Sequence, residues 1–385
     1  MKTETLNFVT ELFAKRELPA YFTTITNTFT DRLIFENLNK EDSNVDILIV
    51  QDLPRYLKIE RAKKPKHIKS FLIKHYPGFL INFKDVKNLS DYLNQRFGKS
   101  SRYKLRREQR KLEHCFDISY KMFYGEMSRE EYDFIFEEFY KLLAVRSIEK
   151  GIENNVNFEY KAAYYKRVHQ QILDKKASFH VIYNGKKPID VCLNFHVNNT
   201  LFQYIRTYDV AYSKFNTGYT DLMKQIQWCI ENKVESISFS KGDFYWKRRW
   251  CNTVYDYDYE VFYNSRSLKA IVTVNKFRLI KSSKQLLREL NIIKMYHAYK
   301  DKRRLASKPE STTKIEILES NHNIETLELA HIDFYSEDYN ELRRLIFEFL
   351  YQSNEQEKDV LAYAIKDRPS CFLLKGKTLN AKVSL

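Results

Sequence analysis

The sequence lacks the cysteine patterns that build disulfide frameworks or zinc sites. Its five cysteines are odd in number and widely spaced, without a Cys-x-x-Cys pair. A short oxidised scaffold or a structural zinc site needs paired, closely spaced cysteines, so both are disfavoured. We expect no bound metal and interpret the cysteines as small buried hydrophobic residues. They are Cys115, Cys192, Cys229, Cys251 and Cys371.

Long apolar runs are also missing. No stretch approaches the roughly 18 uncharged apolar residues that a membrane-spanning helix needs, and Met1 to Thr5 lead into no signal-peptide pattern. We therefore expect a cytoplasmic protein. Internal repeats, low-complexity tracts and recognisable nucleic-acid motifs are absent too, which speaks against nucleic acid as the partner.

Apolar and aromatic residues are abundant. Hydrophobic residues make up 43% of the 385, and the chain has 28 Tyr and 27 Phe. This is enough to fill packed cores, and the length allows two or three domains. The sequence therefore predicts a globular protein of several domains.

Positive charge is concentrated in the first 309 residues. The chain carries +15 overall, but residues 310–385 hold 9 Lys and Arg against 14 Asp and Glu, so the rest carries +20. Such a surface favours an anionic partner, such as cofactor phosphates, acidic glycans or an anionic membrane surface. The charge reverses at a stretch of linker composition, Ala306 to Thr313. We expect three domains, at 1–120, 121–305 and 310–385.

Periodicity predicts a mixed α/β arrangement. Strong helix formers without Gly or Pro mark a helix over 101–114, helical spacing marks 129–148, and a further helix is expected over 158–175. Alternation marks a three-stranded antiparallel meander over 179–183, 189–197 and 201–209. A loop, a helix over 219–232 and a strand over 234–240 follow. In the acidic tail the pattern predicts helices over 336–351 and 355–365 and a strand over 371–375.

The turn Asn216-Thr217-Gly218 is the best candidate for binding a phosphate. Glycine and asparagine accept positive φ, and the helix that follows supplies unpaired N–H donors, although a single glycine before a helix is more often a simple turn. Lys214 and Phe215 precede the turn, and Lys247 in a later loop could also reach phosphates.

These residues resemble a known family. The order Tyr208-Asp209, Phe215-Asn216-Thr217-Gly218, helix, strand, Gly242-Asp243 and Lys247, preceded by the basic segment 101–107, is similar to GNAT-superfamily acyltransferases with a BioF2-like or CelD-like domain. The resemblance covers about residues 80–265. It implies a GNAT fold with a mainly antiparallel sheet flanked by helices, doubled as in Fem-type proteins, so that residues 1–120 would be a second GNAT-like half.

The resemblance also implies the reaction. The donor would be acetyl-CoA or another acyl-CoA, and the acceptor an amine on a sugar or on a precursor of a polysaccharide or lipid. The family's pyrophosphate loop usually reads Gln/Arg-x-x-Gly-x-Gly/Ala, whereas this chain has Ser213 and Asn216 at the Arg and first Gly positions. Cofactor binding would fall to Lys214, Phe215, Asn216, Thr217, Gly218 and Lys247.

Acyl transfer from a thioester needs a base for the amine and an acid for the departing thiolate. Asp209, at a strand end, is the candidate base, with Asp243 as an alternative. Tyr208 or Tyr245 could return the proton to sulfur. Arg206 and His196 are candidates for binding the acceptor. A structural interpretation competes with each, because a strand-end aspartate often caps a loop and an arginine often forms a structural ion pair.

Two alternatives stay open. One is a Fem-type transferase, which takes an aminoacyl group from charged tRNA for peptidoglycan precursors. The other is a non-catalytic basic protein that binds nucleic acid or an anionic membrane. Binding of acyl-CoA separates the first hypothesis from both.

Overall fold

The computed structural model describes residues 1–36, 45–151, 160–292, 295, 314–318, 328–366, 368 and 370–385. The chain divides into two compact units, each made of three segments. Unit 1 consists of Met1–Val86, Phe195–Tyr204 and Cys229–Lys308, and unit 2 of Lys87–Asn194, Ile205–Trp228 and Pro309–Leu385. The predicted linker at 306–313 lies outside the described residues.

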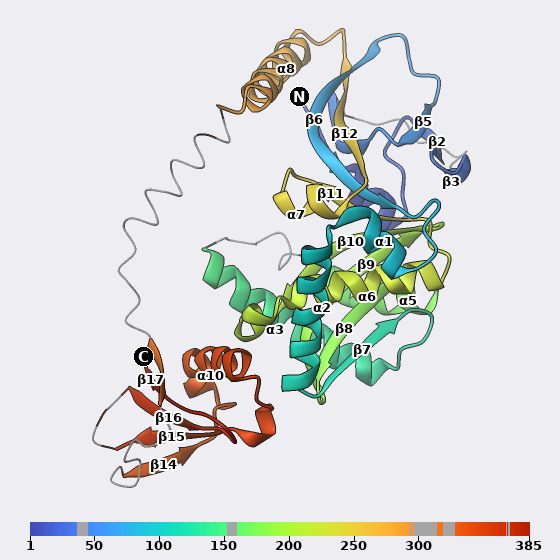
Figure 1. Ribbon diagram of the computed structural model, residues 1–385. Coiled ribbons are helices and arrows are strands. Elements are labelled where there is room, and N and C mark those ends of the chain that lie inside the picture. The colour runs from blue at the N-terminus through green and yellow to red at the C-terminus, as the bar shows by residue number, and fades with distance from the viewer. Residues whose placement is uncertain are drawn as a thin grey trace. The chain divides into compact units, whose positions relative to one another are not determined.

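Unit 1 is built on a mainly antiparallel sheet. Its strands follow the order β1 (Thr3–Asn7), β4 (Ile47–Pro54), β12 (Thr253–Asn264), β6 (Ile68–Asn82) and β11 (Ser236–Lys241). Figure 1 shows β6 and β12 side by side, and they pair antiparallel along most of their length. The alternation of β12 explains its place, because Tyr255, Tyr257 and Tyr259 all face the interior.

Smaller elements complete unit 1. A three-stranded sheet has the order β3 (Arg32–Glu36), β2 (Phe22–Asn27), β5 (Leu57–Arg61). The helical elements are η1 (Thr10–Lys15), α7 (Tyr245–Trp250) and α8 (Leu268–Glu289). The first residues of β10 (Thr200–Tyr208) lie parallel to β11, and this ladder joins only Thr200–Phe202 to Ser236–Ser238.

Unit 2 contains the predicted meander. The strands follow the order β10, β9 (Lys187–Val197), β8 (Ala177–Asn184) and β7 (Ile118–Phe123), and β8, β9 and β10 are the three strands of the predicted meander. Its helices are α1 (Leu89–Arg96), α2 (Lys99–Cys115), α3 (Arg129–Lys150), α5 (Lys161–Leu173) and α6 (Thr217–Glu231), and the 3-10 helix η2 (Val210–Phe215) precedes α6. The mixed, mainly antiparallel sheet with flanking helices is thus confirmed.

Helix ends in unit 2 follow local chemistry. Ser128 begins α3 with a capping box, in which its hydroxyl accepts from the Glu131 amide and the Glu131 side chain reaches back. Gly151 ends the helix at φ 59°, the left-handed conformation that glycine accepts most readily. Both ends agree with the predicted helix.

The acidic tail belongs to unit 2. Its five strands have the order β13 (Lys314–Leu318), β17 (Asn380–Ser384), β16 (Cys371–Lys375), β15 (Leu361–Ile365), β14 (Leu329–Ile332), beside α10 (Asn340–Ser353). One hydrophobic core joins Phe347 of α10 to Phe116, Tyr212 and Phe215. The tail therefore shares a core with α2 and η2.

One predicted element of the tail is wrong. Residues 355–365 form the short 3-10 helix η5 (Glu357–Asp359) and strand β15, where the sequence predicts a helix. The cause is pairing, because β15 bonds to β14 on one side and β16 on the other. The periodicity of a short segment does not reveal which strands will pair with it.

In the part of the chain that the structure describes, no helix combines the length and the apolar character that crossing a bilayer requires.

Candidate functional site

The predicted phosphate-binding turn lies between η2 and α6 in unit 2. Asn216 has φ 53°, so it adopts the left-handed conformation for which glycine and asparagine are suited. Its carbonyl accepts from the amides of Tyr219 (2.9 Å) and Thr220 (3.4 Å). Among the described residues, the amides of Thr217 and Gly218 have no acceptor, so two donors at the start of α6 are unpaired; Thr217 is buried and Gly218 is partly exposed.

Gly218 leaves room for a neighbouring arginine. A Cβ on Gly218 would stand 2.7 Å from Nη1 and 2.8 Å from Nη2 of Arg206. Because real contacts of a Cβ are longer, any larger residue must displace the guanidinium. The glycine therefore lets strand β10 place Arg206 directly against the start of α6.

Arg206 is the centre of a buried ionic network. Its guanidinium donates to Asp190 of β9 (2.5 and 3.2 Å) and lies 3.0 Å from Asp221 of α6. Asp221 also contacts His180 of β8 (2.6 Å) and accepts from Gln225. Three strands and α6 are thus joined by charge, which costs desolvation and makes each member depend on the others.

Burial and the charges of neighbouring groups oppose each other in setting the pKa values of this network. Burial raises the pKa of Asp190 to about 6, against the opposing effect of Arg206. Burial also acts to raise the pKa of Asp221, but Arg206 and His180 outweigh it and lower that pKa. The pKa of Arg206 is raised, because the two carboxylates outweigh its own burial. Arg206 is therefore a fixed cation beside the turn.

The other predicted residues of unit 2 surround this turn. Asp209 caps η2 by accepting from the Ala211 amide (3.0 Å), and it pairs with Lys187 at 3.3 Å. The Tyr208 ring lies under the guanidinium carbons of Arg146 (4.0 Å) and Arg206 (5.3 Å). Lys214 pairs with Glu348 at 2.6 Å. Phe215 is buried in the core and Thr217 is buried at the start of the helix.

The remaining predicted residues belong to unit 1. Lys247 is buried, and its ammonium donates to the carbonyls of Phe239 (2.6 Å) and Lys241 (2.7 Å), at the end of β11. Burial lowers the pKa of Lys247 to about 8. Asp243 pairs with Arg248 at 2.5 Å, and Tyr245 is exposed.

His196 of β9 is buried in unit 1. Burial, together with the charge of Arg16, lowers the pKa of its imidazole to about 3. The Arg16 guanidinium donates a hydrogen bond to the main-chain carbonyl of His196. His196 is therefore neutral at physiological pH.

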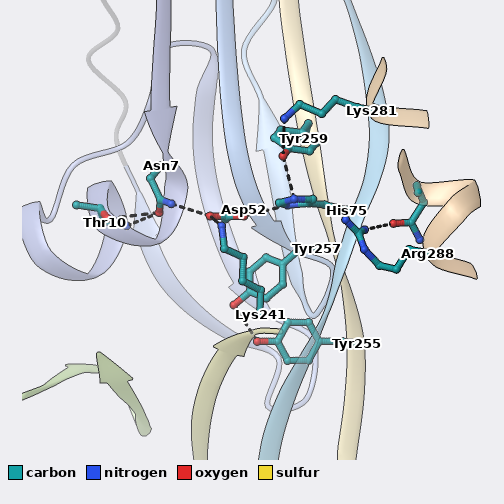
Figure 2. Close-up of polar contacts among 11 residues, drawn as sticks. Asn7, Thr10, Asp52, His75, Lys241, Tyr255, Tyr257, Tyr259, Lys281 and Arg288 are labelled. Atoms are coloured by element: carbon teal, nitrogen blue, oxygen red, sulfur yellow. Dashed lines mark hydrogen bonds and ion pairs between the residues drawn. The ribbon is translucent and has the colours of Figure 1, made fainter. Parts of the chain in front are cut away.

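Sequence reasoning missed a polar cluster in unit 1, which Figure 2 shows. The Asp52 carboxylate accepts from Asn7 (2.6 Å) and Lys241 (2.6 Å), and it lies 3.1 Å from Nδ1 of His75. On the far side of the imidazole, Nε2 lies 2.9 Å from the Tyr259 hydroxyl. Five strands, β1, β4, β6, β11 and β12, each contribute one of these side chains.

The cluster forms a directed chain of hydrogen bonds. With a neutral imidazole, Nδ1–H donates to Asp52 and Nε2 accepts from Tyr259. Burial lowers the pKa of His75 and raises that of Tyr259 to about 12. Lys281 of α8 reaches the Tyr259 hydroxyl at 3.3 Å. The hydroxyl proton of Tyr259 can therefore be shared between its oxygen and Nε2 of His75.

The sequence carries only a faint signal for this cluster. Asp52 and His75 are single polar residues within apolar strands, separated by 23 positions, and Tyr259 lies 184 positions after His75. No local motif unites residues so far apart. No cluster of His, Cys, Asp and Glu among the described residues could hold a metal ion.

Comparison with known families decides the class of the central segment. Residues 99–248 match the family model for the acetyltransferase (GNAT) domain. This segment is a GNAT-type acyltransferase domain. It runs from α2 into α7 and includes the turn at Asn216, Arg206 and Lys247. The GNAT-like fold that the residues imply is thus confirmed, and the GNAT-type domain implies an acyl donor and an amine acceptor.

Solved structures with remote similarity to the chain include three named proteins. FemX is 10% identical, with 56% of this chain and 72% of FemX covered and a TM-score of 0.38. L-PGS from Bacillus licheniformis is 13% identical, with coverage of 61% and 73% and a TM-score of 0.36. The C-terminal domain of a putative lysylphosphatidylglycerol synthetase from Agrobacterium fabrum is 10% identical, with coverage of 62% and 72% and a TM-score of 0.36. A search of curated proteins found no match.

Proposed function

We propose that the chain is an acyl-CoA-dependent N-acyltransferase that moves an acetyl or other acyl group to an amine. The match of residues 99–248 to the GNAT domain carries this proposal. The turn before α6 supports it, because the amides of Thr217 and Gly218 have no acceptor among the described residues and stand at a helix N-terminus, where a pyrophosphate could bind. The BioF2-like and CelD-like resemblance makes an amino sugar, or a precursor of a polysaccharide or lipid, the proposed acceptor.

In this proposal the amine attacks the thioester carbonyl directly. A tetrahedral intermediate forms, the carbon–sulfur bond breaks, and the proton lost by the amine is returned to the thiolate. Asp209 is the proposed base, since its carboxylate is held at the end of β10 by the Ala211 amide and Lys187. Tyr208 is the proposed acid. Asp243 and Tyr245 in unit 1 are the alternatives, and Arg206 and His196 the proposed acceptor contacts.

Calorimetry with acetyl-CoA tests the proposal. We expect saturable heat from the intact protein and several-fold weaker binding by Lys214→Ala, because Lys214 stands two residues before Asn216 and carries an exposed ammonium. Lys166→Ala, an exposed lysine on α5, is the matched control and should bind as the intact protein does. Absence of heat with acetyl-CoA and with longer acyl-CoAs would refute the proposal.

A second candidate is transfer of an aminoacyl group from charged tRNA. The observation that favours it is a row of arginines along α2, Arg102, Arg106 and Arg110, at a spacing of four residues. Lys99, Tyr103 and Gln109 join them around a surface hollow of about 560 Å³. In the described part of the chain, none of the three arginines has a carboxylate partner. Such a row suits a polyanion.

Binding of tRNA separates the two candidates. Tight binding that weakens steeply with salt and is lost in Arg102→Glu/Arg106→Glu, together with no heat from acyl-CoA, would favour the aminoacyl donor. If polyanions or anionic vesicles bind but neither donor supports transfer, a non-catalytic basic protein is left.

A further inference from the structure

Helix α8 has two apolar faces, although it is packed on one side only. Ala270 and Val274 lie on the inner face and share a core with Ile47 and Val261 of the unit 1 sheet. Figure 1 shows α8 beside β6 and β12. A helix that lies on the surface of a soluble domain normally turns polar residues outward. The outward face of α8 departs from this rule.

The outward face is a stripe of large aliphatic side chains. Its five members are between 56% and 79% exposed, and they follow one another at spacings of four, seven, seven and four residues. At 100° per residue these spacings place all five within a narrow sector along about 33 Å of helix. They are Leu268, Val272, Leu279, Leu286 and Leu290. We call this set the α8 stripe.

Basic residues flank the α8 stripe. Lys269 and Lys276 lie along one flank, Lys284 lies farther round the helix on the same side, and Arg278 lies on the other flank. The three lysines have no acidic partner among the described residues. The helix has one acidic residue, Glu289, which already faces Lys74 at 3.7 Å. Figure 2 shows that Lys281 and Arg288 instead reach toward Tyr259 and His75 on the inner side.

We propose that the α8 stripe is a docking surface for an anionic lipid bilayer. An in-plane amphipathic helix places aliphatic side chains below the headgroups while lysines on its flanks meet the lipid phosphates. This arrangement satisfies both features of the outward face. The inference goes beyond the proposed function, because it requires no acyl donor and no transfer.

Charge argues against the other occupants. A second copy of α8 packed on the stripe would bring the lysine flanks of two helices together, with almost no acidic residue to pair with them. Nucleic acid would use the lysines but would leave five aliphatic side chains in water. An anionic bilayer is the partner that takes up both the charge and the apolar surface.

Cosedimentation of the full chain with vesicles tests the proposal. We expect binding to phosphatidylcholine vesicles that contain phosphatidylglycerol, and little binding to phosphatidylcholine alone. Leu279→Ser/Leu286→Ser and Lys276→Glu/Lys284→Glu should each weaken binding by about tenfold or more. Because all four side chains are exposed, the variants should keep the circular dichroism of the intact protein.

Control variants test whether binding depends on the α8 stripe itself or only on the number of exposed aliphatic and basic residues. Ile148→Ser removes an aliphatic residue of α3 that is more exposed than Leu279 or Leu286, and Lys84→Glu/Lys233→Glu makes the same change of net charge elsewhere in unit 1. Both should bind as the intact protein does. Leu279→Trp should show a blue shift of its fluorescence with anionic vesicles only.

Three results would overturn the proposal. The first is no binding of the intact chain to anionic vesicles. The second is equal loss of binding in the α8 variants and their controls. The third is a dimer in solution that Leu279→Ser/Leu286→Ser dissociates, which would make a second copy the occupant.

Discussion

Asn216 has the backbone shape that a glycine would have at the position that the resemblance to GNAT loops assigns to it. Asparagine is one of the few non-glycine residues that adopts φ 53° at low cost. The sequence could predict this, because the property belongs to one residue. It could not predict that Gly218 accommodates Arg206, because this contact joins strand β10 to helix α6.

Substituting Gly218 tests that contact. In Gly218→Ala the new methyl group would stand 2.7 Å from Arg206 Nη1, so the guanidinium must move away from Asp190 and Asp221. We expect a loss of about 1–3 kcal/mol in the free energy of unfolding, measured by urea denaturation. Gly98→Ala, with nothing within 4 Å of its Cβ, should cost under about 1 kcal/mol. Equal effects of the two changes would contradict the packing role.

Lys247 should make stability depend on alkaline pH. Its pKa in the folded protein is lowered to about 8 from 10.5, so between these values the unfolded chain binds more protons than the folded one. The free energy of unfolding then rises with pH across this window, by about 3 kcal/mol in all from this group. Lys247→Met should flatten the rise of the unfolding free energy with pH, whereas Lys58→Met, at an exposed lysine, should leave that rise unchanged. Denaturation midpoints over a pH series measure this.

At the scale of elements, sequence prediction succeeded where the signal is local. Helices α3 and α6 and strands β8 to β10 follow from periodicity, because each shows its buried face within one segment. Helix α2 follows from its strong helix formers and its lack of Gly and Pro. Strand β15 was predicted as a helix, because its strand character depends on β14 and β16. The cluster around Asp52 draws on five strands, so only the folded sheet brings it together.

Asp52 should be the member on which this cluster most depends. It has φ 64° and accepts from Asn7, Lys241 and the buried His75, so its removal leaves three donors unpaired in or beside the core. We expect Asp52→Ala to cost about 3–5 kcal/mol and Asp52→Asn less, because asparagine tolerates the left-handed backbone. Asp243→Asn, at an exposed pair, should cost under about 1 kcal/mol. Thermal and urea denaturation would show this order, and an Asp243 effect as large as that of Asp52 would refute it.

The same residue predicts a response to acid. Burial acts to raise the pKa of Asp52, but hydrogen bonds from His75 and Lys241 outweigh it, so the pKa lies below 3.8. The stability that its charged form contributes is therefore present above pH 3.8 and is lost as the pH falls through the lowered pKa. Asp52→Asn should remove this part of the acid sensitivity. An unchanged acid transition in that variant would contradict the assignment.

At the scale of the whole chain, the charge reversal at residue 310 suggested that the acidic tail is a separate domain. Composition reports where charge changes but not which surfaces share a core. In the structure, Phe347 of α10 is fully buried and lies 4.6 Å from the ring of Tyr212 and 4.9 Å from that of Phe116. Lys214, just before the Asn216 turn, pairs with Glu348 of the same helix. Helix α10 of the tail thus packs against η2.

Truncating the Phe347 side chain should therefore also disturb the GNAT-type domain. In Phe347→Ala the lost ring leaves a cavity against Tyr212 and Phe116, and we expect about 3–5 kcal/mol of destabilisation. Because η2 leads directly to Asn216, acyl-CoA binding should weaken as well if the proposed site is correct. Leu361→Ala, at a half-exposed leucine of β15, should change neither quantity appreciably. Denaturation combined with calorimetry separates the outcomes. Lost stability with full acyl-CoA binding would confine the tail to a structural role. Unchanged stability would show that the shared core does not hold the two segments together.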